Sequence, residues 1–223
     1  MVTLVDYGLG NIQAFANIYK RLNIPVTVAQ TADDLADAEK IILPGVGAFD
    51  WAMSRLEASG MRTCLDDLVL NRKRPVLGIC VGMQMMANRS DEGELPGLNW
   101  INAEVLLFEK EVKGSLSGAK SQESGMNGKD KVGGGAMALP HMGWNDVVPL
   151  NKDTLFKGLD APLFYFLHSY YFSATDPSNV LATTDYNCVF SSAVQADNIF
   201  GVQFHPEKSH QWGVQLLKNF AEL

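Results

Sequence analysis

Hydrophobic residues form short clusters in the first third of the chain, and segments with helical spacing separate these clusters. Each cluster spans four or five residues and ends at a glycine, a proline or a polar residue, which is typical of a buried strand. The expected strands are Val2–Val5, Val26–Ala29, Lys40–Leu43 and Pro75–Ile79. Because strands and helices alternate with short connections, the pattern predicts βαβ units and a parallel sheet.

The segments between these strands predict helices. They run from Asn11 to about Leu22, from Phe49 to Gly60, from Arg62 to Asn71, and from Cys80 through Met83, Met85 and Met86. Asn and Thr are residue types that cap helix N-termini, so Asn11 is expected to begin the first helix. Thr31 is likewise expected to cap a short acidic helix.

The second half of the chain has a different pattern, with many apolar runs and few helical segments. The expected strands are Ile101–Phe108, Asp146–Val148, Phe164–Leu167, Val180–Thr184, Val189–Val194 and Phe200–Phe204. A final helix is expected from about Ser209 to Ala221, with Trp212, Leu216, Leu217 and Phe220 on one face. The predicted fold class is α/β: a mixed, mainly parallel central sheet flanked by helices, with a smaller antiparallel region in the second half.

One stretch, Lys113–Ala136, is rich in glycine and serine and has no apolar periodicity. Such a composition cannot bury enough surface to order itself. We interpret it as a flexible loop within a single domain that covers residues 1–223; the alternative is a linker between two domains. The loop is favoured because Ile101–Phe108 and Asp146–Val148, on either side of it, are expected to be neighbouring strands.

Composition narrows the classes of partner. The 223 residues carry a net charge of −7, which disfavours nucleic acid and anionic membranes as main partners. The three cysteines, Cys64, Cys80 and Cys188, are an odd number without a CxxC pair, so a reduced, cytoplasmic chain is expected. The N-terminus lacks the features of a signal peptide, and no segment approaches the roughly 20 apolar residues that span a bilayer.

The strongest chemical signal is the segment around Cys80. An apolar strand leads into this residue, and Gly78 and Gly82 flank it at two positions on either side. This spacing matches a nucleophile elbow with cysteine in place of serine, where larger side chains would clash between strand and helix. A following helix N-terminus would favour the thiolate, and the backbone N–H of Val81 would face a developing oxyanion. The alternative is that Cys80 is an ordinary buried cysteine. Cys64 and Cys188 lack this setting and are interpreted as structural.

A thiolate nucleophile needs a base, and His205 is the best candidate of the four histidines. It follows the expected strand Phe200–Phe204, and Pro206 ends that strand and turns the chain. Glu207 could then fold back onto the imidazole and fix its tautomer. On its own this motif is compatible with an ordinary surface turn. A metal site is disfavoured, because no HxxxH or CxxC spacing is present, and no cofactor is expected.

A third element follows the strand Lys40–Leu43. Gly45 and Gly47 surround Val46 after Pro44, and such a segment can present backbone N–H groups to an anion. The sequence pattern by itself is only that of a turn.

These three elements, in this order, resemble the class I (triad-type) glutamine amidotransferases, whose two signatures are G-I-C-V-G-M-Q (residues 78–84) and F-H-P-E (204–207). The resemblance covers nearly the whole chain. D-Y-G-L-G-N, L-P-G-V-G-A-F, P-H-M-G-W-N, L-H-S-Y-Y and Q-F-H-P-E-K-S look like the glutaminase subunit of imidazole glycerol phosphate synthase. The resemblance implies glutamine hydrolysis and delivery of ammonia to a separate (β/α)8-barrel synthase subunit.

The resemblance also implies roles for individual residues. Cys80 matches the nucleophile, His205 the acid–base and Glu207 its orienting partner. Gly45, Val46 and Gly47 match the segment that completes the oxyanion hole with Val81. Residues that match contacts to the glutamine are Gln84, Glu92, Ser169 and Tyr170. Residues that match positions facing the synthase partner and the ammonia passage are Asn11, Met142, Trp144 and Lys208.

Two features depart from the usual pattern of that subunit. The Lys113–Ala136 insertion is longer than usual, and K-S-H-Q-W-G (208–213) with F-Y-F-L (164–167) also resembles a paralogous branch that supplies ammonia for amidination of a surface-polysaccharide sugar. The ammonia acceptor is thus open between the two. Other classes are a stand-alone triad hydrolase and a non-catalytic interaction subunit that keeps the fold.

Overall fold

In the computed structural model, residues 1–108 and 138–223 are described. The expected flexible loop at 113–136 lies outside these residues. The helices are α1 (Ile12–Arg21), α2 (Ala32–Leu35), α3 (Phe49–Ala58), α4 (Arg62–Asp66), α5 (Val81–Gln84) and α6 (His210–Glu222). A π-helical turn (Asp67–Asn71) extends α4, and two 3₁₀ turns cover Pro177–Asn179 and Pro206–Lys208.

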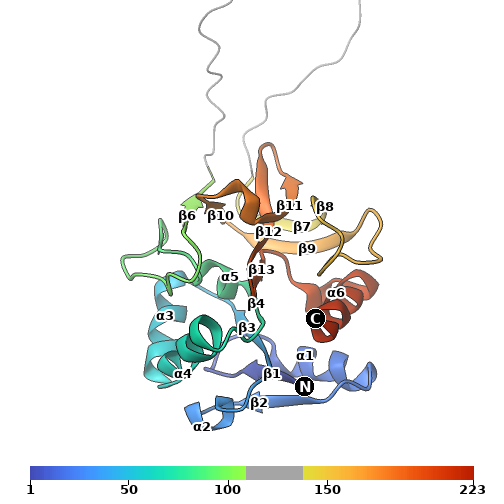
Figure 1. Cartoon of the computed structure of the whole chain (residues 1–223). Helices are drawn as coiled ribbons and strands as arrows, with labels where there is room; N and C mark the ends of the chain where they lie inside the picture. Colours follow the sequence, from blue (N-terminus) through green and yellow to red (C-terminus); the bar gives the residue numbers. More distant parts are fainter. Residues whose placement is uncertain (109–137) are drawn as a thin grey trace, which may run out of the picture.

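The first four strands form a parallel layer as the sequence pattern predicts. They are β1 (Val2–Val5), β2 (Val26–Ala29), β3 (Lys40–Gly45) and β4 (Val76–Cys80), paired in the order β2-β1-β3-β4. Helices α3 and α4 lie on one side of this layer, and α1 and α6 lie on the other (Figure 1). The sheet is therefore covered on both faces, as parallel sheets require.

The remaining strands extend the sheet or form a small second one. They are β5 (Arg89–Ser90), β6 (Ala103–Leu107), β7 (His141–Asp146), β8 (Val148–Pro149), β9 (Leu163–His168), β10 (Tyr170–Ala174), β11 (Val180–Asp185), β12 (Val189–Ala196) and β13 (Ile199–Val202). The sheet continues from β4 through β13, β12, β10, β6 and β5, with β11 and β8 beside β12. Strand β13 is parallel to β4, and the pairs of β12 with β13, β10 and β11 are antiparallel. The predicted mixed, mainly parallel fold with a smaller antiparallel region is confirmed.

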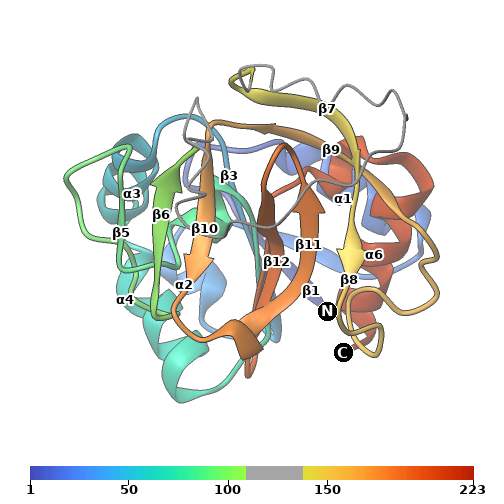
Figure 2. The same ribbon diagram turned by 90° about the horizontal axis from the view of Figure 1, so that it is seen from above.

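The second sheet consists of β7 and β9, which pair antiparallel (Figure 2). This pairing contradicts one expectation. The segments on either side of the long loop are not neighbouring strands, because β6 pairs with β10 and β5 whereas β7 and β8 pair with β9 and β11. Apolar runs indicate that strands exist, but the pairing depends on long-range packing that a local pattern does not contain.

Several element boundaries also differ from the expectation. The sequence pattern does not predict β5, β7 and β10 as separate strands. β7 contains a glycine and three polar residues, and β10 is separated from β9 only by Ser169. The helix after Cys80 ends at Gln84 and does not include Met85 and Met86, which are fully buried. Asn11 precedes α1 but makes no side-chain cap hydrogen bond, whereas Thr31 forms a complete capping box with Asp34.

Candidate active site

Cys80 occupies a strained turn at the carboxyl end of β4. Its φ is +54°, a left-handed conformation that is unusual for a residue with a side chain. A Cβ atom at Gly82 would collide with the carbonyl oxygen of Leu43, and one at Gly78 would lie 2.6 Å from Cε of Met86. The two glycines therefore allow the elbow to form, as the spacing predicts, and the thiol is presented at the sheet edge.

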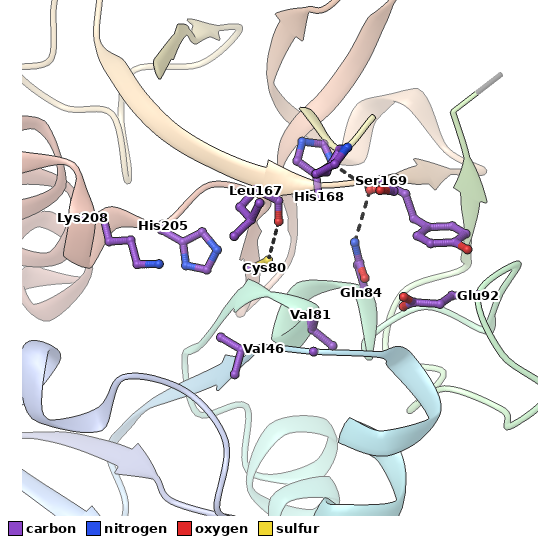
Figure 3. A pocket seen from close by; sticks show the side chains of 13 residues that line it. Val46, Cys80, Val81, Gln84, Glu92, Leu167, His168, Ser169, His205 and Lys208 are labelled. Carbon is purple, nitrogen blue, oxygen red and sulfur yellow. Dashed lines mark hydrogen bonds between the residues drawn. The ribbon is translucent and has the colours of Figure 1, made fainter. Parts of the chain in front are cut away.

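His205 reaches the same edge because β13 is the parallel neighbour of β4. The chain leaves β13 and turns at Pro206, and Nδ1 of His205 lies 3.0 Å from Oε1 of Glu207. Both side chains are almost fully buried. Nε2 of His205 has no hydrogen-bond partner within the described residues, and this is the nitrogen left for the thiol. Figure 3 shows the imidazole beside Cys80.

The electrostatic surroundings favour a protonated imidazole. Burial alone lowers the pKa of His205, but interactions of the ring with Cys80 and Glu207 outweigh burial and raise the pKa to about 10. Both neighbours are acidic groups, and negative charge beside the ring stabilises the imidazolium. The site therefore favours a protonated His205 beside Cys80.

The turn that carries Glu207 is fixed by residues to which the sequence analysis gave no role. Ser209 Oγ donates to the carbonyl of His205 at 2.6 Å and accepts the Tyr165 N–H at 3.0 Å. The His205 N–H in turn donates to the carbonyl of Tyr165 at 2.8 Å. A Cβ atom at Gly213 would collide with the carbonyl oxygen of Pro206, so α6 packs directly against the turn. Fixed contacts on both sides hold His205 and Glu207 in place.

A pocket of about 320 Å³ opens over Cys80. It is lined by Val46, Gly47, Cys80, Val81, Gln84, Glu92, Pro140, Leu167, His168, Ser169, Tyr170, His205 and Lys208. In Figure 3, Cys80 lies in the middle, His205 and Lys208 lie on one side, and Gln84 and Glu92 lie on the other. The pocket thus extends from the thiol toward a polar end that carries one carboxylate.

The four residues expected to contact substrate all line this pocket. Oε2 of Glu92 accepts the Phe49 N–H at 2.9 Å, and burial raises the pKa of Glu92 against the effect of that bond. Nε2 of Gln84 donates to the carbonyl of Tyr170 at 3.3 Å and to Oε1 of Gln203 at 3.1 Å. Burial and the nearby charge of Glu92 raise the pKa of Tyr170.

The expected oxyanion segment lies against the elbow. Gly45 pairs with Cys80 across the β3–β4 ladder, and Val46, Gly47 and Val81 line the pocket. Gly47 has a φ of +87°, which glycine adopts without strain. Just before this segment, the carbonyl of Pro44 accepts a 2.7 Å hydrogen bond from the buried hydroxyl of Tyr7. Tyr7 is a further residue without an expected role, and it anchors the start of the segment.

Of the four residues expected to face the synthase partner, three lie on one side of the site and Asn11 lies apart. Met142 and Trp144 alternate with inward-facing residues on β7 and are 65% and 46% exposed. Trp144 stacks on His210 with ring centroids 5.2 Å apart, and Lys208 lies over the Tyr165 ring at the pocket margin. Asn11 is exposed at the start of α1 and does not line the pocket. Three of the four are therefore brought to one side of the site.

Across 1–108 and 138–223, no group of three or more His, Cys, Asp or Glu side chains is arranged to hold a metal ion. Within the same ranges, no helix is both long and apolar enough to cross a bilayer.

Residues 3–223 match the family model described as "Glutamine amidotransferase class-I". The chain belongs to this family. Class-I amidotransferases are enzymes, and the elbow cysteine of this member stands in the pocket described above. The resemblance inferred from the sequence motifs is thus confirmed.

Curated relatives of this amidotransferase carry a more specific name. The chain is 57% identical to "Imidazole glycerol phosphate synthase subunit HisH" of Bdellovibrio bacteriovorus and 44% identical to the subunit of that name in Leptospira interrogans. Each alignment covers 100% of both chains. The name of these relatives denotes a subunit, so the family branch includes members that work within a larger synthase.

Solved structures share the fold of this amidotransferase at low sequence identity. One glutamine amidotransferase superposes with a TM-score of 0.70 at 16% identity, with 100% of this chain and 99% of that chain covered. PurLQS from Thermotoga maritima superposes with a TM-score of 0.65 at 17% identity, with 99% and 97% covered. These likenesses support the fold.

Proposed function

We propose that the chain is the glutaminase subunit of imidazole glycerol phosphate synthase and serves histidine biosynthesis. It hydrolyses L-glutamine and delivers ammonia to a separate (β/α)8-barrel subunit. The observation that carries the proposal is the buried Cys80–His205–Glu207 arrangement over a pocket with a polar end. The name of its full-length relatives supports the choice of synthase. A cytoplasmic location is part of the same prediction.

In the proposed reaction, Cys80 acts as a thiolate beside protonated His205. Sγ of Cys80 adds to the side-chain amide carbon of glutamine, and the C=O electrons move to oxygen. Backbone N–H groups of Val81 and of the Gly45–Gly47 segment stabilise that oxyanion. His205 gives its proton to the departing nitrogen, the C–N bond breaks, and a γ-glutamyl thioester with free ammonia results.

A second half-reaction releases glutamate. Neutral His205 removes a proton from water, whose oxygen attacks the thioester carbon. The C–S bond then breaks and returns the thiolate, with His205 protonated again. Glu207 keeps Nδ1 of His205 protonated in both halves, so Nε2 carries the exchanged proton.

The pocket also suggests how glutamine is oriented. Both N–H bonds of the Gln84 amide are directed to the carbonyl of Tyr170 and to Gln203, so its Oε1 remains as an acceptor. Together with the carboxylate of Glu92, this acceptor suits the α-ammonium group of the substrate. Ser169 and Tyr170 complete the same end of the pocket. The side-chain amide then extends toward Cys80.

The test is glutamate release by the full chain, measured with and without the barrel subunit. Cys80→Ala is expected to reduce hydrolysis by at least about 10⁴-fold, because no other nucleophile can form the thioester. Circular dichroism should show an unchanged fold. Substantial hydrolysis by Cys80→Ala would refute the assignment, and full wild-type activity without any partner would favour a stand-alone hydrolase.

The acceptor is tested separately. Purified chain is mixed with the imidazole glycerol phosphate cyclase subunit from the same organism, and glutamine-dependent product formation is followed. Stimulated glutamine hydrolysis with coupled product supports histidine biosynthesis. If glutamine hydrolysis is stimulated only by the barrel protein of a surface-sugar amidination pathway, the chain belongs to the paralogous branch.

A further inference from the structure

Two buried histidines beside the pocket take no part in the mechanism above. His141 on β7 and His168 at the end of β9 face each other in the β7–β9 ladder and are 3% and 6% exposed. Nδ1 of His141 lies 3.0 Å from Nε2 of His168. Neither ring has a carboxylate among its hydrogen-bond partners in the described residues.

The direction of every hydrogen bond in this pair is fixed from both ends. Nδ1 of His168 lies 2.8 Å from the carbonyl of Tyr170, which can only accept, so His168 carries its proton on Nδ1. Its Nε2 is then an acceptor, and His141 must donate from Nδ1. Nε2 of His141 accepts from Nδ2 of Asn145 at 3.2 Å.

The amide of Asn145 is oriented independently of the histidines. Its Oδ1 accepts the Asp146 N–H at 2.8 Å, and its Nδ2 also donates to the carbonyl of Asp185 at 3.0 Å. Nδ2 therefore faces His141 as a donor. Both imidazoles are neutral in this arrangement, in keeping with burial, which lowers the pKa of His141 to about 4 and of His168 to about 3.

The chain of donors ends at the substrate pocket. The carbonyl of Tyr170 accepts from His168 and also from Nε2 of Gln84. Because this carbonyl can only accept, Gln84 must present its N–H₂ to it, and its Oε1 is left for the ligand. The segment from Leu167 to Tyr170, which lines the pocket, is thus held by a hydrogen bond across its own turn.

We infer that His141 and His168 are positioning residues for the glutamine pocket, forming an ordered relay from Asn145 to the carbonyl of Tyr170. This inference rests on the proposed function. The relay begins on the inward face of β7, and the outward face of that strand carries Met142 and Trp144. Side chains alternate along a strand, so a shift of β7 moves both sets together. The relay therefore connects the exposed face of β7 to the orientation of Gln84.

The test compares substitutions that keep or remove single bonds of the relay. His168→Leu removes both bonds, and His168→Asn keeps a donor at the position of Nδ1. In the chain with its barrel subunit, His168→Leu is expected to raise KM for glutamine about tenfold with kcat changed less than about threefold, as the loss of these two hydrogen bonds allows. His168→Asn should restore most of the loss. Equal KM values for wild type, Leu and Asn variants would overturn the inference.

A second measurement does not depend on catalysis. Nitrogen-15 spectra of histidine-labelled wild-type chain should show His141 and His168 protonated on Nδ1 and unprotonated on Nε2. The opposite tautomer at either ring would overturn the relay even if glutamine is hydrolysed. A wild-type chain that shows these tautomers but never hydrolyses glutamine would instead refute the proposed function. This measurement also decides the inference if His168→Leu does not fold.

Discussion

At the scale of single residues, His205 combines deep burial with a raised pKa. It is 2% exposed, and burial by itself would favour the neutral ring. Two acidic neighbours, Cys80 and Glu207, reverse that preference. The proton on His205 is therefore bound more tightly in the folded chain than in the unfolded chain.

Glu207→Gln tests this balance. The variant keeps a hydrogen-bond acceptor but loses the carboxylate charge, so the pKa of His205 falls. We expect kcat to drop by about 10²- to 10⁴-fold and the alkaline limb of the pH–rate profile to move to lower pH. An unchanged alkaline limb would show that Glu207 does not set the protonation of His205.

Glu207→Gln should also change how the free energy of unfolding depends on pH. A raised histidine pKa stabilises the fold fully below the unfolded value of about 6.5, and this contribution is lost as the pH rises through the folded value of about 10. The difference in unfolding free energy between wild type and Glu207→Gln should therefore be largest below pH 6.5 and shrink toward pH 10. Urea titrations across this range measure it.

At the scale of elements, the site is built where strand ends meet. β3 supplies the Gly45–Gly47 segment, β4 supplies Cys80, and β13 leads into His205. Tyr7, which follows β1, ties these elements together because its hydroxyl donates to the carbonyl of Pro44. Burial, followed by the nearby charge of Cys80, raises the pKa of this hydroxyl, so Tyr7 stays a donor.

Tyr7→Phe removes that donor and leaves a buried carbonyl unpaired. We expect a loss of unfolding free energy of about 1–3 kcal/mol and a lower kcat, because the oxyanion segment loses its anchor. The matched control is Tyr19→Phe, which removes an equally buried hydroxyl from the carbonyl of Leu217, between α1 and α6. Thermal unfolding and glutaminase kinetics of both variants separate the effects: equal losses of kcat would contradict a specific role for Tyr7.

The sequence predicts local features of the site better than contacts between distant strands. The elbow at Cys80 was predictable, because the need for Gly78 and Gly82 is local to one turn. The proximity of His205 and Glu207 was predictable for the same reason. The family resemblance identified candidates on distant segments. By contrast, Gln203, His141 and His168 depend on a register between strands far apart in sequence, so their partners were not predictable.

The prediction of strand pairing was wrong for the same reason. The apolar run Ile101–Phe108 correctly predicted β6, but β6 pairs with β10, a strand that the sequence pattern did not separate from β9. Within β7 only His141, at its start, is buried, so the segment lacks the apolar alternation typical of a strand, and its pairing with β9 identifies it as one.

At the scale of the whole molecule, one side of the site presents apolar groups to solvent. Met142 and Trp144 project from β7, and His210 stacks on Trp144. A tryptophan with this exposure is a common anchor of protein interfaces. This surface is consistent with the proposed docking of a barrel subunit beside the pocket.

Trp144→Ala is therefore expected to weaken binding of the barrel subunit by about ten- to thirtyfold, as truncation of an aromatic anchor typically does. Calorimetric titration and partner-stimulated glutaminase activity provide the measurements. The control is Val28→Ala, an exposed apolar residue on β2. Strand β2 lies at the opposite end of the molecule from β7 (Figure 1). Similar affinities for the two variants would place the interface elsewhere.

The order of strands also has a consequence for biosynthesis of the chain. β4 lies between β3 and β13, and β13 is the last strand in the described part of the sequence. During translation, Cys80 and its elbow emerge long before residues 199–207, so β4 keeps an open edge until β13 has been synthesised. A nascent chain that lacks residues 199–207 thus carries Cys80 without His205 and Glu207. The topology delays assembly of the proposed triad until β13 and the turn after it are available.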